Sequence, residues 1–489
     1  MRSWVKRAAL AIALILAVLA AVIVLRALLV ESTHAPGEPV EVAEEVDFDR
    51  AVQRLSDVVQ FRTVTPVDDD DDLSPFYELH GYLEEEFPLF HERAQRELVG
   101  GLTPHYTVEG TDPSAPHVVF LAHLDVVPVE DGTEDDWHHP PFAGVVDEAF
   151  VWGRGTLDNK QNMMAMLEAA EVWFESGGKP QNTLHFVFGH DEETGGLEGA
   201  KVVADAMEER DLDVAAVYDE GLLILDGVVP GVDDPVALVG VTEKGYVTLE
   251  ISARAEGGHS SMPPDELAVL RLAKAIDSLD QHPMVAAIDG PTREMFDELA
   301  PEMSFGHRLI FRNLWLFEPL VLSQMTSSPS TNAAVRTTAA PTILRAGQRE
   351  NVLPQEAVAT VNFRIHPRDD VSSVIDYVEA VVGNDHISVE VAGERQVDPS
   401  PVARMEGDGF EALSRAFETV HPEIAMAPNM LIALSDSRHF TGLTDDVYRF
   451  TPIQVTADDL DRIHGTNERI AIDEYHSLIR YYQALLHQW

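Results

Sequence analysis

Three short, largely apolar runs mark the first half of the chain, at residues 118–122, 184–188 and 214–218. Runs of this length that are rich in Val and Phe are typical of strands buried on both faces of a parallel sheet. Each run is followed at once by acidic residues or a histidine. Because ligands of open α/β sheets bind beyond the carboxyl ends of the strands, we predict an α/β fold whose chemistry lies at that edge.

The polar residues that follow these runs predict a metal site. They are His123 and Asp125 after the first run, Glu192 and Glu193 after the second, and Asp219 and Glu220 after the third. Carboxylates that crowd together repel unless a cation neutralises them. Adjacent glutamates usually form a solvated turn. At the end of a buried strand, one of them can instead bind metal while the other serves as a general base.

Asp158 precedes an apolar-periodic segment that we expect to be a helix. An N-cap is the simplest role for such an aspartate. Gly153 and Gly155 lie just before it, and they let the backbone approach a ligand closely. Both roles therefore remain open for Asp158 from the local pattern alone.

The periodicity changes after Gly245. We expect strands at 246–253, 331–344, 357–365 and 387–391 and helices at 265–279 and 372–382. The order β-α-β-β-α-β is that of a ferredoxin-like unit, here inserted into the first domain. A further segment at 282–328 contains Trp315 and Phe317, whose side chains either line an apolar groove or fill a core. We favour the core.

The N-terminus has the pattern of a membrane anchor. Arg2, Lys6 and Arg7 precede an apolar run from Ala8 to Leu25. Such a run is long enough to span a bilayer, and its basic flank faces the cytoplasm, which places the remaining chain in the periplasm or outside the cell. A cleaved signal peptide is the competing interpretation. The predicted organisation is an anchor at 1–30, a linker at 31–46, a catalytic domain at 47–244 and 394–489, and a lid at 245–393.

Composition narrows the classes of function. A chain of 489 residues is long enough for two domains. It has 84 acidic and 34 basic residues, a formal charge of −50, which argues against binding to nucleic acid. It has no cysteine, so disulfides and thiolate ligands are excluded. The aspartate run 68–72 is expected to be a solvated loop, because it lacks the ligand spacing of a calcium loop.

Two histidines lie in loops of special composition. His259 stands in Gly-Gly-His-Ser-Ser before a predicted helix, where Ser261 can cap the helix but His259 has no structural role. His464 lies in Arg-Ile-His-Gly near the C-terminus.

These motifs together resemble the dinuclear-zinc metallopeptidase family that includes aminoacylase-1 and carboxypeptidase S. The branch most similar is that of carboxypeptidase S and the secreted N-fatty-acyl-amino-acid synthase/hydrolase. The matching stretches run in family order across nearly the whole chain after the anchor, at 121–128, 152–160, 191–196, 219–221, 258–261, 362–366 and 463–465.

The resemblance implies a zinc-exopeptidase-like domain with a mixed, largely parallel sheet and an inserted ferredoxin-like lid. It also implies two Zn²⁺ per subunit, with Co²⁺ or Mn²⁺ as substitutes. Asp158 would bridge the ions, and Asp219 is favoured over Glu220 as the last carboxylate. The expected ligands are His123, Asp158, Glu193, Asp219 and His464.

Further roles follow from the same resemblance. Asp125 would orient the His123 ring, and Glu192 would be the general base. The histidine that matches His259 acts from the other subunit in this family, which implies a homodimer. The residues expected to bind the free carboxylate of a small-molecule substrate are Asn332, Arg364 and Arg438.

The expected function is zinc-dependent hydrolysis of an amide bond in dipeptides or N-acyl amino acids. The alternative is an inactive, membrane-anchored binding protein on the same fold. A metal-storage protein is a third interpretation, but it does not explain why the acidic residues follow strands.

Overall fold

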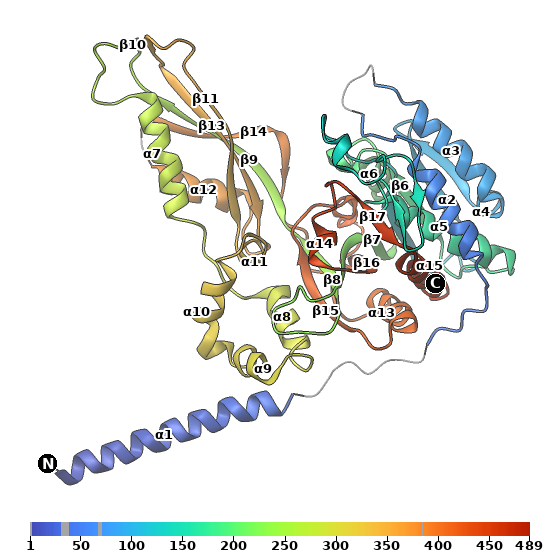
Figure 1. Ribbon diagram of the computed structural model, residues 1–489, viewed down its shortest axis with the longest axis horizontal. Coiled ribbons are helices and arrows are strands. Elements are labelled where there is room, and N and C mark those ends of the chain that lie inside the picture. Colours follow the sequence, from blue (N-terminus) through green and yellow to red (C-terminus); the bar gives the residue numbers. More distant parts are fainter. Residues whose placement is uncertain (1, 31–38, 67–70, 384) are drawn as a thin grey trace.

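The computed structural model describes residues 2–30, 39–66, 71–383 and 385–489. Figure 1 shows a large body around one sheet, a smaller unit around a second sheet, and the helix α1 (Arg2–Leu28), which extends away from both. Three residues of the aspartate run, 68–70, and residues 31–38 of the predicted linker lie outside the described residues.

The large body contains an eight-stranded mixed sheet. Strands β3 and β6 are parallel, β3 and β7 are parallel, and β7 is parallel to β16, whereas β1 and β2 form an antiparallel edge. This architecture confirms the predicted fold class. In spatial order the strands are β1 (Gln95–Val99), β2 (Thr103–Val108), β6 (Leu184–Gly189), β3 (His117–His123), β7 (Val214–Leu225), β16 (Val447–Val455), β8 (Val236–Glu243) and β15 (Ala425–Leu431).

Helices cover both faces of this sheet. Val118 and Phe120 of β3 pack into the main core, whereas Val119 and Leu121 pack into a second core on the opposite face. This alternation follows from the two-residue period of a strand. One face carries α2 (Phe48–Val59), α3 (Ser74–Glu86), α4 (Pro88–Arg93), α5 (Lys160–Glu175), α13 (Asp408–Val420) and α15 (Ile472–Leu486). The other carries α6 (Ala200–Glu209) and the 3₁₀ helix η3 (Asp436–Phe440).

The smaller unit has the predicted β-α-β-β-α-β order. Its antiparallel sheet has the spatial order β11 (Thr338–Ala346), β13 (Glu356–Ile365), β9 (Gly245–Arg254) and β14 (Ile387–Val397). Helices α7 (Ala268–Gln281) and α12 (Val371–Val382) pack on it around a separate core. The short strands β10 (Gly258–His259) and β12 (Val352–Leu353) pair at its far tip. Strand β14 continues beyond the boundary predicted at 393.

Four short helices lie between α7 and β11. They are α8 (Gly290–Glu298), α9 (Phe305–Phe311), α10 (Leu314–Met325) and α11 (Pro329–Ala333). The strand expected from 331 begins only at Thr338, because Pro329 favours the first turn of a helix. The core that these helices form includes Val236 of β8. The preference for Trp315 as a core residue was wrong, since its side chain is 52% exposed.

A small three-stranded sheet links two loops that are distant in sequence. It consists of β17 (Arg469–Ala471), β5 (Phe150–Trp152) and β4 (Val145–Val146), with Arg469 opposite Trp152. This pairing brings the loop at 153–158 beside the loop at 461–468. The remaining short elements are η1 (Glu134–Asp136), η2 (Glu192–Thr194) and α14 (Ala457–Leu460).

Among the helices described, one is long and apolar enough to cross a membrane. It covers Trp4–Leu28, with a mean hydropathy of 3.2 and no buried residue in its most apolar window.

Candidate metal centre

Two histidines approach opposite oxygens of Asp158. The Nε2 atom of His123 lies 2.9 Å from Asp158 Oδ1 and 3.2 Å from Glu220 Oε1. The Nε2 atom of His464 lies 3.1 Å from Asp158 Oδ2 and 3.2 Å from Glu193 Oε2. The two groups therefore share one carboxylate between them.

These side chains come from three neighbouring strands and two loops. His123 ends β3 and Glu193 follows β6 in η2, whereas Glu220 lies within β7, which continues to Leu225 instead of ending at the predicted residue 218. Asp158 lies two residues before α5, whose N-cap is Asn159, so Asp158 does not have the N-cap role. His464 follows α14 in a left-handed conformation with φ of 60°. The structure thus brings the ends of neighbouring strands and two loops to one edge of the sheet, as the sequence pattern predicted.

The fully buried Asp125 lies behind His123. The Nδ1 atom of His123 is 3.0 Å from the backbone oxygen of Asp125 and 3.3 Å from its Oδ1. Both atoms are acceptors, so Nδ1 carries a hydrogen, and Nε2 is the ring nitrogen that faces the carboxylates. Asp125 Oδ2 in turn accepts hydrogen bonds from Thr65 Oγ1 at 2.7 Å and from the backbone N–H of Glu193 at 3.2 Å.

The structure places the carboxylate of Glu220, not that of the preferred Asp219, beside His123. Its Oδ2 accepts the backbone N–H of Ser437 at 2.8 Å, and its Oδ1 accepts the backbone N–H of Glu220 at 2.8 Å. The Glu220 carboxylate is the one that reaches His123. Successive side chains on a strand point to opposite sides, so only one of these two neighbours can face the centre.

The glutamates of the centre resist ionisation. Burial, followed by the charges of Asp436, Glu220 and Glu193, raises the pKa of Glu192 well above its usual value. Burial and the neighbouring charge of Asp158 raise the pKa of Glu220 to about 8. These shifts indicate an excess of negative charge that calls for cations.

The pKa values of the two histidines are raised by the same carboxylates. Hydrogen bonds to Asp158 and Glu193 raise the pKa of His464 to about 10. Burial acts to raise the pKa of Asp158, but hydrogen bonds from His123 and His464 outweigh it and lower that pKa. The centre therefore favours positive charge on both sides of Asp158.

The donor set fits divalent cations. The ligand atoms of His123, Asp158 and Glu220 lie within 4.8 Å of one another, and so do those of Asp158, Glu193 and His464. Imidazole nitrogens and carboxylate oxygens are the ligands that zinc takes in cysteine-free sites. Glu193 Oε1 is buried without a hydrogen-bond partner among the described residues, as expected of an oxygen that awaits a cation.

An ion pair holds the two loops of the centre together. Arg154 Nη1 donates to Glu468 Oε2 at 2.5 Å, and both side chains are buried. Glu468 Oε1 accepts the backbone N–H groups of Gly155 at 2.9 Å and Leu157 at 2.8 Å. Sequence reasoning missed this role of Glu468. The available signal was an acidic residue shortly after His464 and an arginine shortly before Asp158.

The three residues predicted to bind a substrate carboxylate lie in different surroundings. Arg438 is 7% exposed, and its Nη2 donates to the backbone oxygen of Gly195 at 2.6 Å, while Nη1 and Nε are buried without a partner among the described residues. The Arg364 guanidinium lies 5.0 Å from the centroid of the Tyr246 ring. Asn332 lines a cavity of about 650 Å³ on the smaller unit.

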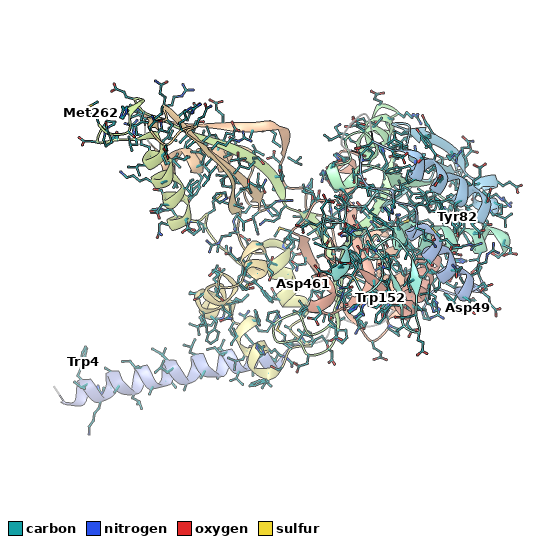
Figure 2. All side chains as sticks on the ribbon, turned by 45° about the horizontal axis from the view of Figure 1, so that its top comes forward. Trp4, Asp49, Tyr82, Trp152, Met262 and Asp461 are labelled. Carbon is teal, nitrogen blue, oxygen red and sulfur yellow. The ribbon has the colours of Figure 1, made fainter. Side chains whose placement is uncertain are left out.

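His259 lies apart from the centre. It is exposed on β10 at the tip of the smaller unit, and its Nδ1 accepts the backbone N–H of Ser261 at 3.1 Å. Figure 2 labels the nearby Met262 at that tip, whereas Asp461, close to His464 in sequence, lies in the large body. The structure therefore does not bring His259 of the same chain to the other site residues.

Paired histidine and carboxylate groups at the edge of an α/β sheet are typical of metal-dependent hydrolases. The model of peptidase family M20/M25/M40 matches residues 119–488, and the chain belongs to this family. The predicted resemblance is thereby confirmed. Membership makes the chain an amide-bond hydrolase and implies divalent metal ions.

Similar sequences include an N-fatty-acyl-amino acid synthase/hydrolase and a carboxypeptidase S-like protein. An N-fatty-acyl-amino acid synthase/hydrolase of Xenopus tropicalis is 37% identical over 91% of this chain and 87% of its own. A probable carboxypeptidase S-like protein of Dictyostelium discoideum is 37% identical over 89% of this chain and 84% of its own.

Solved structures share the fold. An M20 family metallo-carboxypeptidase from Sulfolobus solfataricus has a TM-score of 0.63 and 18% identity, covering 90% of this chain and 98% of its own. Human carnosine dipeptidase 1 has a TM-score of 0.60 and 16% identity, covering 90% of this chain and 96% of its own.

Proposed function

We propose that the protein hydrolyses the amide bond of N-acyl amino acids or dipeptides that carry a free carboxylate, and that it uses two divalent metal ions, Zn²⁺ or its substitutes Co²⁺ and Mn²⁺. The observation that carries this proposal is the position of Asp158 between His123 and His464, at 2.9 and 3.1 Å. The proposed ligand sets are His123 with Glu220, and His464 with Glu193, joined by Asp158.

Glu192 is the proposed general base. When bound, the two cations would polarise the scissile carbonyl and acidify water. Glu192 takes a proton from water and returns it to the departing nitrogen. Asp125 keeps the His123 ring oriented throughout.

Recognition of the substrate carboxylate is assigned to Arg438, supported by Arg364 and Asn332. Arg438 has donors without a partner among the described residues, and a guanidinium suits a carboxylate. In a chain with a formal charge of −50, an anionic substrate requires such a local positive group.

We further propose a homodimer in which His259 of the partner subunit stabilises the oxyanion. The exposed position of this histidine at the tip of the smaller unit supports a role outside its own chain. An oxyanion needs a hydrogen-bond donor in addition to a cation.

The helix α1 is proposed to anchor the protein in a membrane, with the catalytic body on the extracytoplasmic side. Its length, its mean hydropathy of 3.2 and the basic residues before it support this orientation. A cleaved signal peptide is the alternative.

The choice between the two substrate classes is tested by rates on Gly-Leu and on N-oleoyl-Phe. The relatives are named for N-fatty-acyl amino acids and for carboxypeptidase activity, so we expect hydrolysis of at least one of these substrates. This hydrolysis should depend on metal, because the family implies divalent metal ions. Chelation should abolish turnover, and Zn²⁺, Co²⁺ or Mn²⁺ should restore it. A metal-loaded protein that turns over neither substrate would favour the inactive binding protein.

A further inference from the structure

Helix α10 is apolar on both its inner and its outer side. Leu314, Val321 and Met325 pack into the local core. On the outer side, Trp315 is 52% exposed, and Leu316 and Leu320 are 41% and 62% exposed. Leu316 and Leu320 are neighbours on the helix surface because they are four residues apart. We call Trp315, Leu316 and Leu320 the outer face of α10.

The sequence around this face departs from the rest of the chain in charge. Glu318 is the only acidic residue between Met303 and Arg349, although the chain has 84 acidic residues among 489. The same stretch contains Arg308 and Arg312. A surface that faced only water would be expected to carry the acidic residues that cover the remaining chain. Their absence here favours contact with an apolar surface.

This region also holds the C-terminal end of α1. Asn313 Nδ2 donates to the backbone oxygen of Ile23 at 3.1 Å, and Arg26 Nε donates to the backbone oxygen of Arg312 at 3.1 Å. Ala27 is fully buried in this contact region, unlike most of α1. Figure 1 shows α9 beside this end of α1, with α10 next to α9. The end of α1 that contacts α9 is the end at which an anchored chain would leave the lipid.

We infer that the outer face of α10 lies in the interface of the bilayer and forms a second attachment of the enzyme to its membrane. This inference rests on the proposed insertion of α1. Tryptophan is enriched at this depth, and apolar residues on one side of a surface helix bind there. Transmembrane helices are commonly tilted, and a tilt of α1 leaves the smaller sheet outside the lipid, since that sheet lies on the far side of α10 from α1.

The attachment would bring the enzyme close to lipophilic substrates. An N-acyl amino acid with a long chain partitions into the same interface, because each buried methylene contributes favourably. A second copy of the chain is the other occupant that such an apolar face can take. The two occupants differ in whether the side chains at this face meet lipid or protein.

The test uses the absence of cysteine, which makes one introduced cysteine a unique site for a spin label. Three full-length variants are compared in liposomes of phosphatidylcholine and phosphatidylglycerol. Leu320→Cys reports on the outer face, Leu14→Cys on the middle of α1, and Leu98→Cys is the control. Leu98 is 41% exposed on β1, at the edge of the large sheet. Collision with oxygen, which enters lipid, is measured against collision with a water-soluble nickel chelate.

We expect the label at 320 to collide several-fold more with oxygen and less with nickel than the label at 98. A label at 320 that remains open to nickel while the label at 14 lies in lipid overturns the inference and leaves the anchor intact. A label at 320 shielded from both reagents points to a second copy and also overturns it. Lipid contact at 320 with a water-exposed label at 14 removes the anchor and overturns the inference as stated, because α10 would then be the first attachment and not the second.

Discussion

Arg154 and Glu468 form a buried ion pair whose Nη1 and Oε2 atoms are 2.5 Å apart. The pair connects the loop that carries Asp158 to the loop that carries His464, so both groups of the metal centre depend on it. Removal of one partner leaves a buried charge without compensation.

We therefore predict that Arg154→Met lowers the free energy of unfolding by about 3–5 kcal/mol. Metal affinity should fall by about 10–100-fold, because the ligand loops lose their support. Chemical denaturation and metal titration measure the two effects. Lys201→Met is the control, since the exposed pair of Lys201 and Asp205 should contribute at most about 0.5 kcal/mol. Equal losses in the two variants would contradict the role of the buried pair.

The choice between Glu220 and Asp219 gives a second prediction. Glu220→Gln should reduce the number of tightly bound cations per chain, because its carboxylate reaches His123. Asp219→Asn should keep the cations, since the oxygens of Asp219 accept backbone N–H groups instead. Metal analysis of the two purified variants measures this difference. The reverse pattern would restore Asp219 as the ligand.

Arg438 should distinguish substrates by their carboxylate. Arg438→Lys removes the planar pair of donors, so KM for a free-acid substrate should rise by about 10–100-fold, as for the loss of a hydrogen bond between charged groups. The same substrate with an amidated terminus should be turned over equally by both proteins. Steady-state kinetics on the matched pair of substrates is the measurement. A similar change in KM for both substrates would mean that Arg438 acts only structurally.

The buried Glu168 should make the free energy of unfolding depend on pH. Its burial, only partly offset by Arg54, raises its pKa from 4.5 to about 7 in the folded protein. In the unfolded chain this carboxyl ionises first, so its contribution to stability is complete below pH 4.5 and is lost as the pH rises through 7. The free energy of unfolding of the wild type, minus that of Glu168→Gln, should fall by about 3 kcal/mol over this range. A difference that is constant with pH would contradict the raised pKa.

Much of the centre could be predicted because strand ends follow simple rules. Apolar runs located β3, β6 and the first part of β7, and the residues after them meet because these parallel strands run toward one edge of the sheet. The orientation of Asp219 and Glu220 could not be predicted in this way. The pairing of β7 with β16 shifts register just after Asp219, and this irregularity is set by contacts between distant segments.

Two other features depend on tertiary structure alone. The ion pair of Arg154 and Glu468 joins residues that only the pairing of β5 with β17 brings together. Trp315 lies in a segment apolar enough for a core, and composition does not tell which side of α10 is covered.

The central claim is that Glu192 transfers the proton while its neighbours hold the metal, and one comparison tests it. Metal content and turnover are measured for Glu192→Gln, with His464→Ala as the variant that should lose a cation. The account predicts that Glu192→Gln keeps the metal content of the wild type while turnover falls by about 10²–10⁴-fold. Near-normal turnover by Glu192→Gln with its metal in place would contradict it.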